Sequence, residues 1–249
     1  MESPDSNGKP KGNAAAADDA GETFNSLSLE EVKTLVGGLL SAGVDTTGGL
    51  LTWKLLFVAL CATTQERIHA ELSASMNRHS VDHLIPACIT PKEAPYLHAA
   101  LRESHRLANT TITIPMKTLI AETVVHDVTL PASSVVLFDS FTTGMRPDLV
   151  GDQGKDFDPS RFLPDAIAAR KGTAAAILDH PFFVGPFSQG ARKCPGSRVA
   201  NMEAAALLGQ LVLDWHITVP GIQHWTDVPY DLETLTTAQM PPMQFSARV

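Results

Sequence analysis

From residue 26 onward, apolar and polar positions recur with the period of an α-helix. The stretch that begins SLSLEEVKTLVGGLL opens on a capping-box pattern, because Ser28 precedes Glu31 by three positions. Apolar residues occupy most sides of the helix that follows, so the pattern predicts a long, buried helix. Two amphipathic stretches, TTQERIHAELSAS and APYLHAALRESHRLA, predict two further helices.

The pattern changes beyond residue 110, where Val, Ile and Thr become frequent. Pro115 and Pro131 interrupt this part of the chain, and β-branched runs broken by proline are typical of short strands. The sequence therefore predicts a few short strands before residue 140.

Gly and Pro dominate residues 143–186, which predicts a long irregular loop with one weak helical patch near 165–178. A last apolar, helical pattern runs from about Ser197 to Trp215. Short strand-like pieces follow it. The expected fold class is mainly α with small β-sheets.

Residues 2–23 mix Pro, Gly, Ser, Asp and alanine without large apolar side chains, so we expect a disordered polar leader over 1–24 and a folded domain over 25–249. The leader lacks the apolar core of a signal peptide and the arginine-rich character of a transit peptide. The most apolar stretch, residues 35–62, contains Asp45 and Lys54, which argues against a membrane span.

Composition narrows the class of protein. With 249 residues, of which 44% are hydrophobic, the chain is long enough to form a sizeable core. A formal charge of −8 argues against nucleic acid as a partner. The three cysteines are too few for a disulfide framework and show no zinc-binding spacing: Cys61, Cys88 and Cys194.

The long predicted helix carries an unusual number of glycines, each of which costs up to about 1 kcal/mol relative to alanine. Small residues in a buried helix suggest a flat object lying against the backbone. These glycines are Gly37, Gly38, Gly43, Gly48 and Gly49.

Cys194 follows two basic residues and precedes the last predicted helix. Basic neighbours and a helix N-terminus both stabilise a thiolate. Pro195 fits the first turn of that helix, which would leave the N–H groups of Gly196 and Ser197 free to point at the sulfur. A cysteine that only fills space in a core needs none of these features, so the pattern favours a ligand.

The ten residues FSQGARKCPG resemble the cysteine-loop signature of the cytochrome P-450 family, Phe-x-x-Gly-x-Arg-x-Cys-x-Gly, and match every fixed position. The resemblance implies that Cys194 is the axial thiolate of haem b, that Arg192 contacts a haem propionate and that Phe187 packs beside the sulfur. Gly190 and Gly196 would let the backbone turn tightly around it. A thiolate ligand suits O–O cleavage because it donates electron density to the iron.

The sequence AGVDTT is similar to the oxygen-binding part of that family's long central helix. The resemblance implies that Asp45 and Thr46 deliver protons. A threonine hydroxyl can bond back to the helix carbonyls and open a groove beside the small residues Ala42 and Gly43. A solvent-facing Asp45 with structural threonines is the alternative.

Glu103 and Arg106 resemble the family's Glu-x-x-Arg pair, and FDPSRF resembles the loop that adds a third member, Arg161. By this resemblance the three form a buried network that ties their helix to the cysteine loop. We interpret the network as structural, because buried charged networks hold geometry.

Other patterns favour ordinary roles. His79 and His83 have a metal-ligand spacing but no third ligand, so we expect surface histidines. Trp53, Trp215 and Trp225 are expected to pack in the core.

The resemblance covers residues 26–249 and corresponds to the C-terminal half of the family's fold. It implies a haem-thiolate monooxygenase that inserts one atom of O2 into an apolar organic substrate, with electrons from a flavoprotein reductase or ferredoxin. That donor would dock near Arg192, Lys193 and Arg198. Residues 109–115 would line part of the substrate pocket.

Two alternatives remain open. One is a truncated, non-catalytic chain that binds haem weakly, or only with a partner that supplies the missing N-terminal half. The other is a helical protein with an inert cysteine. The sequence names neither the substrate nor the compartment, and it leaves membrane association open.

Overall fold

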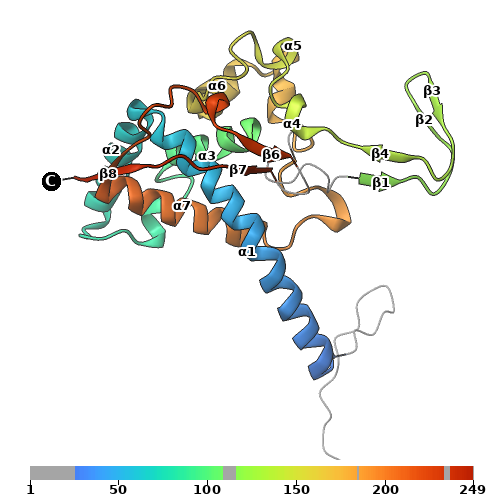
Figure 1. Ribbon diagram of the computed structural model, residues 1–249, viewed down its shortest axis with the longest axis horizontal. Coiled ribbons are helices and arrows are strands. Elements are labelled where there is room, and N and C mark those ends of the chain that lie inside the picture. Colours follow the sequence, from blue (N-terminus) through green and yellow to red (C-terminus); the bar gives the residue numbers. More distant parts are fainter. Residues whose placement is uncertain (1–25, 109–115, 184, 233–235, 249) are drawn as a thin grey trace, which may run out of the picture. The chain divides into compact units, whose positions relative to one another are not determined.

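The structure is a computed structural model that describes residues 26–108, 116–183, 185–232 and 236–248 (Figure 1). The expected leader over 1–24 lies outside the described residues. Two compact units make up the chain, Met1–Leu40 and Ser41–Val249, and helix α1 (Leu29–Ala59) begins in the first and continues into the second.

In the first unit, the predicted capping box starts α1. The backbone N–H of Ser28 donates to the Glu31 carboxylate at 2.8 Å, and the Glu31 N–H donates to the Ser28 hydroxyl at 3.3 Å. These hydrogen bonds stabilise the charged carboxylate and lower the pKa of Glu31. The predicted start of the helix is confirmed.

The second unit contains the other predicted helices close to their expected positions: α2 (Ala62–His79), α3 (Pro95–Leu107) and α7 (Ser197–Asp214). Their apolar faces meet in one core cluster, to which α1 contributes Val58, α2 contributes Leu72, α3 contributes Leu97 and α7 contributes Leu208. Helices α2 and α7 approach closely at Gly209, where an added Cβ would lie 3.2 Å from Leu72 Cδ1.

A second core cluster is aromatic. Trp53 stacks on Phe57 and meets Trp225 edge-on, and both tryptophans are buried as predicted. Trp215 is 38% exposed and packs edge-on against Phe245, so its expected place in the core is wrong. It begins a strand in which only Ile217, two residues further on, is buried, so the core reaches this face of the strand at Ile217 and not at Trp215.

The described strands pair only two at a time, all antiparallel: β1 (Met116–Thr118) with β4 (Val135–Leu137), β2 (Thr123–Val125) with β3 (Val128–Leu130), β5 (Trp215–Thr218) with β8 (Gln244–Ala247), and β6 (Tyr230–Leu232) with β7 (Thr236–Ala238). The predicted class, mainly α with small sheets, is confirmed.

Short helical turns replace much of the predicted irregular loop. They are α4 (Ser140–Thr143), α5 (Pro147–Val150), η2 (Pro159–Phe162), α6 (Pro164–Ala169) and η3 (Ala174–Asp179). The weak helical patch expected near 165–178 corresponds to the last two. Three more 3-10 turns are η1 (Pro86–Ile89), η4 (Gly190–Arg192) and η5 (Trp225–Asp227).

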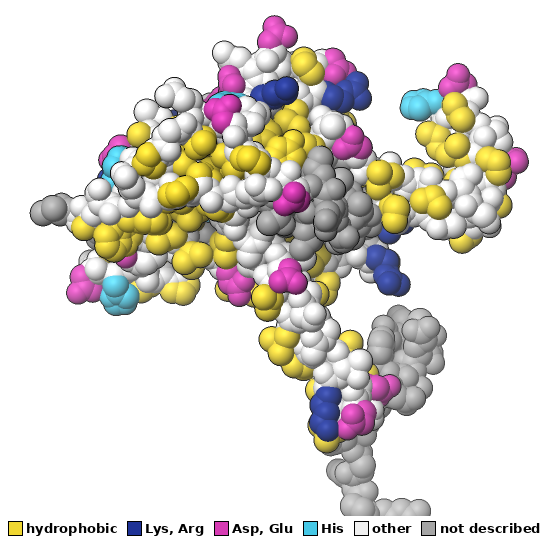
Figure 2. All heavy atoms as spheres, viewed as in Figure 1, with side chains coloured by type: hydrophobic (Ala, Val, Ile, Leu, Met, Phe, Trp, Pro, Cys, Tyr) yellow, Lys and Arg dark blue, Asp and Glu magenta, His cyan; other side chains and the backbone are white. Residues whose placement is uncertain are grey.

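The apolar side chains of α1 are buried only from Leu50 onward, and Val44 is 69% exposed. The expectation of a helix buried along its length is therefore wrong for its N-terminal part. An apolar pattern shows that a helix tolerates burial, whereas burial itself requires a segment that covers it. Hydrophobic side chains are visible on the surface of both units in Figure 2.

No helix in the described part of the chain is, by itself, both long and apolar enough to cross a membrane. Only α1 and α2 taken together reach that length and hydropathy, and they are bent by 103° at the break between them.

Candidate functional site

The cysteine loop, residues 185–196, is held by its own backbone. The Cys194 N–H donates to the Phe187 carbonyl at 2.9 Å, and the Lys193 N–H donates to the Gly190 carbonyl at 3.0 Å. Gly190 has a φ of 79°, a left-handed conformation that glycine adopts without a steric penalty. The loop leaves Cys194 as a free, exposed thiol.

The junction between this loop and α7 differs from the expected one. Gly196 is the N-cap and Ser197 the first helical residue, so Pro195 precedes the first turn. The Ser197 N–H donates to the Cys194 carbonyl at 3.4 Å and is not free, which corrects the expectation that it points at the sulfur. Gly196 stays close to the thiol, because a Cβ there would lie 3.8 Å from Sγ.

The second candidate set lies on α1. The Thr46 hydroxyl donates to the Ala42 carbonyl at 2.7 Å, the back-bonding expected for this threonine. The Asp45 side chain is exposed, and a Cβ added at Gly43 would meet no atom within 4 Å. This stretch of α1 therefore presents an open backbone flank beside a carboxylate and a hydroxyl.

Among the described residues, no hydrogen bond or ion pair joins this part of α1 to the cysteine loop. The two candidate sets are thus separate surfaces of the described structure. Residues 109–115, the expected pocket lining, lie outside the described residues.

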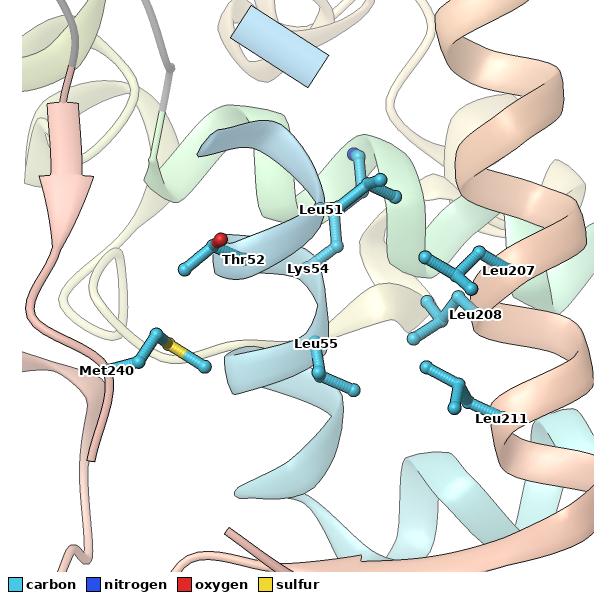
Figure 3. A pocket seen from close by; sticks show the side chains of 8 residues that line it. All are labelled: Leu51, Thr52, Lys54, Leu55, Leu207, Leu208, Leu211 and Met240. Carbon is cyan, nitrogen blue, oxygen red and sulfur yellow. The ribbon is translucent and has the colours of Figure 1, made fainter. Parts of the chain in front are cut away.

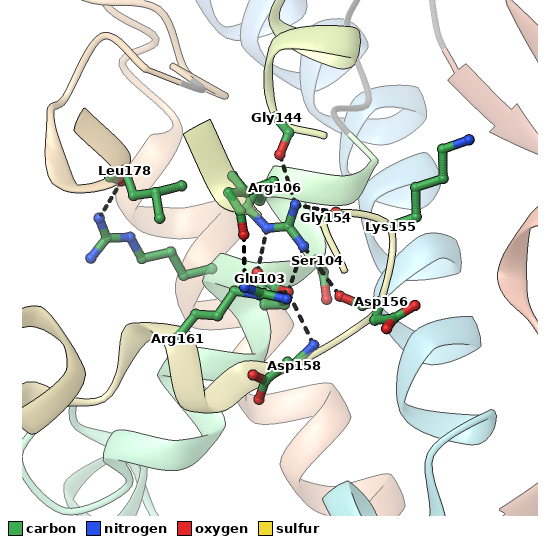
Figure 4. A network of polar contacts seen from close by, with 12 residues as sticks. Glu103, Ser104, Arg106, Gly144, Gly154, Lys155, Asp156, Asp158, Arg161 and Leu178 are labelled. Carbon is green, nitrogen blue, oxygen red and sulfur yellow. Dashed lines mark hydrogen bonds and ion pairs between the residues drawn. The ribbon is translucent and has the colours of Figure 1, made fainter. Parts of the chain in front are cut away.

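The structure brings Glu103, Arg106 and Arg161 together (Figure 4). Arg106 donates from Nε and Nη2 to the two carboxylate oxygens of Glu103, at 2.7 Å each, and both side chains are fully buried. Arg161 Nε lies 3.4 Å from Glu103 Oε1. The carboxylate of Glu103 thus faces two guanidinium groups.

The network holds α3 to residues 144–158. Arg106 Nη1 donates to the carbonyls of Gly144 and Gly154, at 2.7 and 2.6 Å, and the Asp158 N–H donates to Glu103 Oε1 at 3.0 Å. These partners differ from the expected one, the cysteine loop. Buried guanidinium donors satisfy carbonyls that a long irregular segment would otherwise leave unpaired.

The contact between α3 and the cysteine loop involves His105, a residue that the sequence analysis did not single out. Its ring meets the Phe187 ring edge-on, with 5.4 Å between centroids. His105 is only 7% exposed, and within the part of the chain that the structure describes neither ring nitrogen makes a hydrogen bond of good geometry. Burial and the nearby Lys54 hold the pKa of His105 well below 6.5, although the neighbouring Asn201 side chain acts in the opposite direction.

Lys54 is a second notable residue of this region. In the sequence, its charge served only as an argument against a membrane span. Its ammonium group is buried and donates to the Leu101 carbonyl of α3 at 2.8 Å. Burial lowers the pKa of Lys54 to about 7. The sequence signal for Lys54 was a basic side chain inside an otherwise apolar stretch, whereas His105 lies among polar residues and gave no such signal.

A shallow cavity of about 170 Å³ lies between α1 and α7 (Figure 3). It is lined mainly by leucines, together with Thr52, Met240 and Lys54. None of the candidate site residues lines it. We therefore assign no ligand to it.

His79 and His83 behave as the sequence analysis expects. His79 lies 3.9 Å from Glu93, and His83 lies 2.8 Å from its neighbour Asp82, both at the surface. In the part of the chain that the structure describes, no group of three or more His, Cys, Asp or Glu residues could hold a metal ion.

Comparison with known proteins identifies the fold. The chain superposes on the structure "Retinoic acid bound cyanobacterial CYP120A1" with a TM-score of 0.74 and 24% sequence identity, over 94% of this chain and 49% of the other. The mainly helical fold with small sheets is thus a cytochrome P450 fold.

Sequence comparison agrees. The family model described as "Cytochrome P450" matches residues 12–241, so the chain belongs to the cytochrome P450 family. Curated relatives include cytochrome P450 2U1 of Bos taurus, 28% identical over 75% of this chain, and the mitochondrial cholesterol side-chain cleavage enzyme of Homo sapiens, 27% identical over 86%. The alignments span 32% and 38% of those two relatives, roughly a third of their length.

Proteins of this family are oxidoreductases of the monooxygenase class and use haem b with a cysteine thiolate as axial ligand. The residues present fit that group. Cys194 offers an exposed sulfur donor, and the space beyond Gly190 and Gly43 is open to a flat ligand, since a Cβ at either position would meet no atom within 4 Å.

Proposed function

We propose that this chain forms the haem-binding part of a monooxygenase that inserts one oxygen atom of O2 into an apolar organic substrate. The observation that carries the proposal is the exposed Cys194 thiol, set in a loop that matches the family signature within a chain of that family. When bound, the haem would supply the redox chemistry: one oxygen atom enters the substrate and the other leaves as water, with two electrons and two protons consumed.

Residues of the cysteine loop would hold the haem. Cys194 Sγ is the proposed axial ligand, and the exposed Arg192 guanidinium is the proposed partner of a propionate. Phe187 would pack beside the sulfur, while Gly190 and Gly196 keep side chains away from it. Hydrogen bonding of the Cys194 N–H to the Phe187 carbonyl fixes the backbone that carries the ligand.

Residues of α1 would supply protons on the other face of the haem, beside Ala42 and Gly43. The Thr46 hydroxyl proton is engaged with the Ala42 carbonyl, so Thr46 can accept a hydrogen bond without rearrangement and must release that carbonyl before it donates. Asp45 is exposed and can exchange protons with water. We assign proton delivery to this acid and alcohol together.

Electrons would come from a flavoprotein reductase or a ferredoxin. Arg192, Lys193 and Arg198 are exposed at and beside the cysteine loop and form a basic surface that suits an acidic partner. Reduction rates that fall as the salt concentration rises would support this docking surface. Rates independent of salt would exclude it.

A carbon-monoxide difference spectrum of the reduced, haem-loaded chain tests the proposed function. We expect the strongly red-shifted Soret band of thiolate ligation in the wild type and in the control Cys61→Ser, and its loss in Cys194→Ser. A band that survives in Cys194→Ser, or a folded wild-type chain that takes up no haem, would refute the assignment.

A second candidate is a non-catalytic chain that binds haem only together with a partner that supplies further parts of the fold. Exposed apolar side chains favour it, since large exposed patches mark interaction sites; on α7 these include Val199, Met202 and Leu207. Haem uptake by the isolated, folded chain separates the two candidates.

A further inference from the structure

Two buried basic side chains lie on helices that a hydrogen bond joins, α1 and α3. Lys54 on α1 is 1% exposed and His105 on α3 is 7% exposed. Lys54 donates one hydrogen bond, to the Leu101 carbonyl, although an ammonium group carries three donors. Among the described residues, no hydrogen bond of good geometry reaches either nitrogen of the His105 imidazole, although the Asn201 side chain lies near enough to the ring to favour its protonated form. Unsatisfied buried polar groups of this kind require an explanation beyond packing.

A continuous series of contacts runs from Lys54 to Cys194. Lys54 Nζ donates to the Leu101 carbonyl, which in a helix is also the acceptor for the backbone N–H of His105. The His105 ring meets the Phe187 ring, and the Phe187 carbonyl accepts from the Cys194 N–H. Each step involves a direct contact between named groups.

We propose that His105 is a positioning residue for the cysteine loop, and that burial together with the nearby Lys54 keeps its ring uncharged. The neutral ring supports Phe187, and Phe187 in turn fixes the backbone of Cys194. This inference rests on the proposed function only for the role of Cys194 as a haem ligand.

The surroundings of the pair explain why a second positive charge is disfavoured. Lys54 is the charged group that acts on His105 from α1, and α7 contributes the uncharged Asn201. On α3 itself, the Glu103 carboxylate is engaged by Arg106 and by Arg161. Among the described residues, no carboxylate acts on His105 to compensate a second positive charge, and two unpaired cations in a low-dielectric core repel strongly.

Amide hydrogen exchange of the full chain tests the support that His105 gives. We expect His105→Ala to speed exchange of the Lys193 and Cys194 amides by about 2- to 10-fold, the range that corresponds to the loss of one aromatic pair. His105→Phe keeps a ring against Phe187 and should stay within about 2-fold of the wild type. Equal exchange in the wild type and His105→Ala would overturn the proposal.

Histidine NMR of the same chain tests the role of Lys54. The His105 signal is identified by its absence in His105→Phe. In Lys54→Met the removal of the nearby charge should move the His105 titration midpoint to higher pH, while the exposed Lys92→Met leaves it unchanged. A purely structural Lys54 would leave the midpoint where it is, and that result would overturn the proposal even if His105→Ala fails to fold.

The two proposals fail separately. If the exchange and NMR results are as expected but Cys194→Ser keeps the thiolate spectrum, the haem assignment is wrong and the positioning pair stands. If the spectrum assigns Cys194 but neither His105 nor Lys54 variants change the loop or the titration, the pair is wrong and the proposed function stands.

Discussion

Burial lowers the pKa of Lys54 from 10.5 to about 7. Between these values the unfolded chain binds a proton that the folded chain does not, so the free energy of unfolding should rise with pH from about 7 upward, by at most about 1.4 kcal/mol per pH unit. Below that range both states are protonated and the penalty is constant.

Lys54→Met should remove this rise. We expect urea unfolding at pH 7 and pH 9 to show a smaller difference in the free energy of unfolding for Lys54→Met than for the wild type. The exposed Lys92→Met serves as the control and should behave like the wild type. A variant with the wild-type pH dependence would show that Lys54 keeps its ordinary pKa in the folded protein.

Glu103 allows a sharp comparison between buried and exposed ion pairs. Glu103→Gln leaves Arg106 buried without its counter-charge and should lower the free energy of unfolding by about 3–5 kcal/mol. In the exposed pair of Arg146 and Asp148, with side chains 56% and 58% exposed, Asp148→Asn should change it by less than about 1 kcal/mol. Similar losses in the two variants, measured by urea unfolding, would contradict a buried network.

The family resemblance grouped Glu103, Arg106 and Arg161, and local helix chemistry was enough to foresee the back-bonded hydroxyl of Thr46. It could not foresee His105 and Lys54 as a pair, because they lie on different helices and only the packing of α1 on α3 brings them together. The prediction of a free Ser197 N–H was wrong, because the backbone N–H groups of a turn donate to nearby carbonyls of the same turn.

At the scale of elements, periodicity located the long helices well, since a repeated apolar spacing specifies both the type and the length of an element. It placed α2, α3 and α7 close to their observed bounds. It did not anticipate the turns within 143–186, because single turns are too short to show a period. Periodicity could not predict the exposure of Val44 either, since burial of a helix face depends on another segment that covers it.

Alanine substitutions at two glycines of α1 distinguish an effect on helix stability from an effect on haem binding. A Cβ at either Gly38 or Gly43 would meet no atom within 4 Å, so replacement of each by alanine should stabilise the helix, by up to about 1 kcal/mol. Only Gly43→Ala adds a methyl group to the surface proposed to face the haem. We expect weaker haem binding in an absorbance titration for Gly43→Ala and unchanged binding for Gly38→Ala; equal affinities would show that the haem does not approach Gly43.

At the scale of the whole molecule, a ligand that binds only the folded chain raises its stability by mass action. With haem at about 100 times its dissociation constant, the free energy of unfolding should increase by about 2.7 kcal/mol. Because the proposed iron ligand is Cys194, most of this increase should disappear in Cys194→Ser and persist in Cys61→Ser. Urea unfolding with and without added haem measures it. An equal increase in all three proteins would mean that haem binds to exposed apolar surface, such as Val199 and Leu207 of α7, and not through the thiolate.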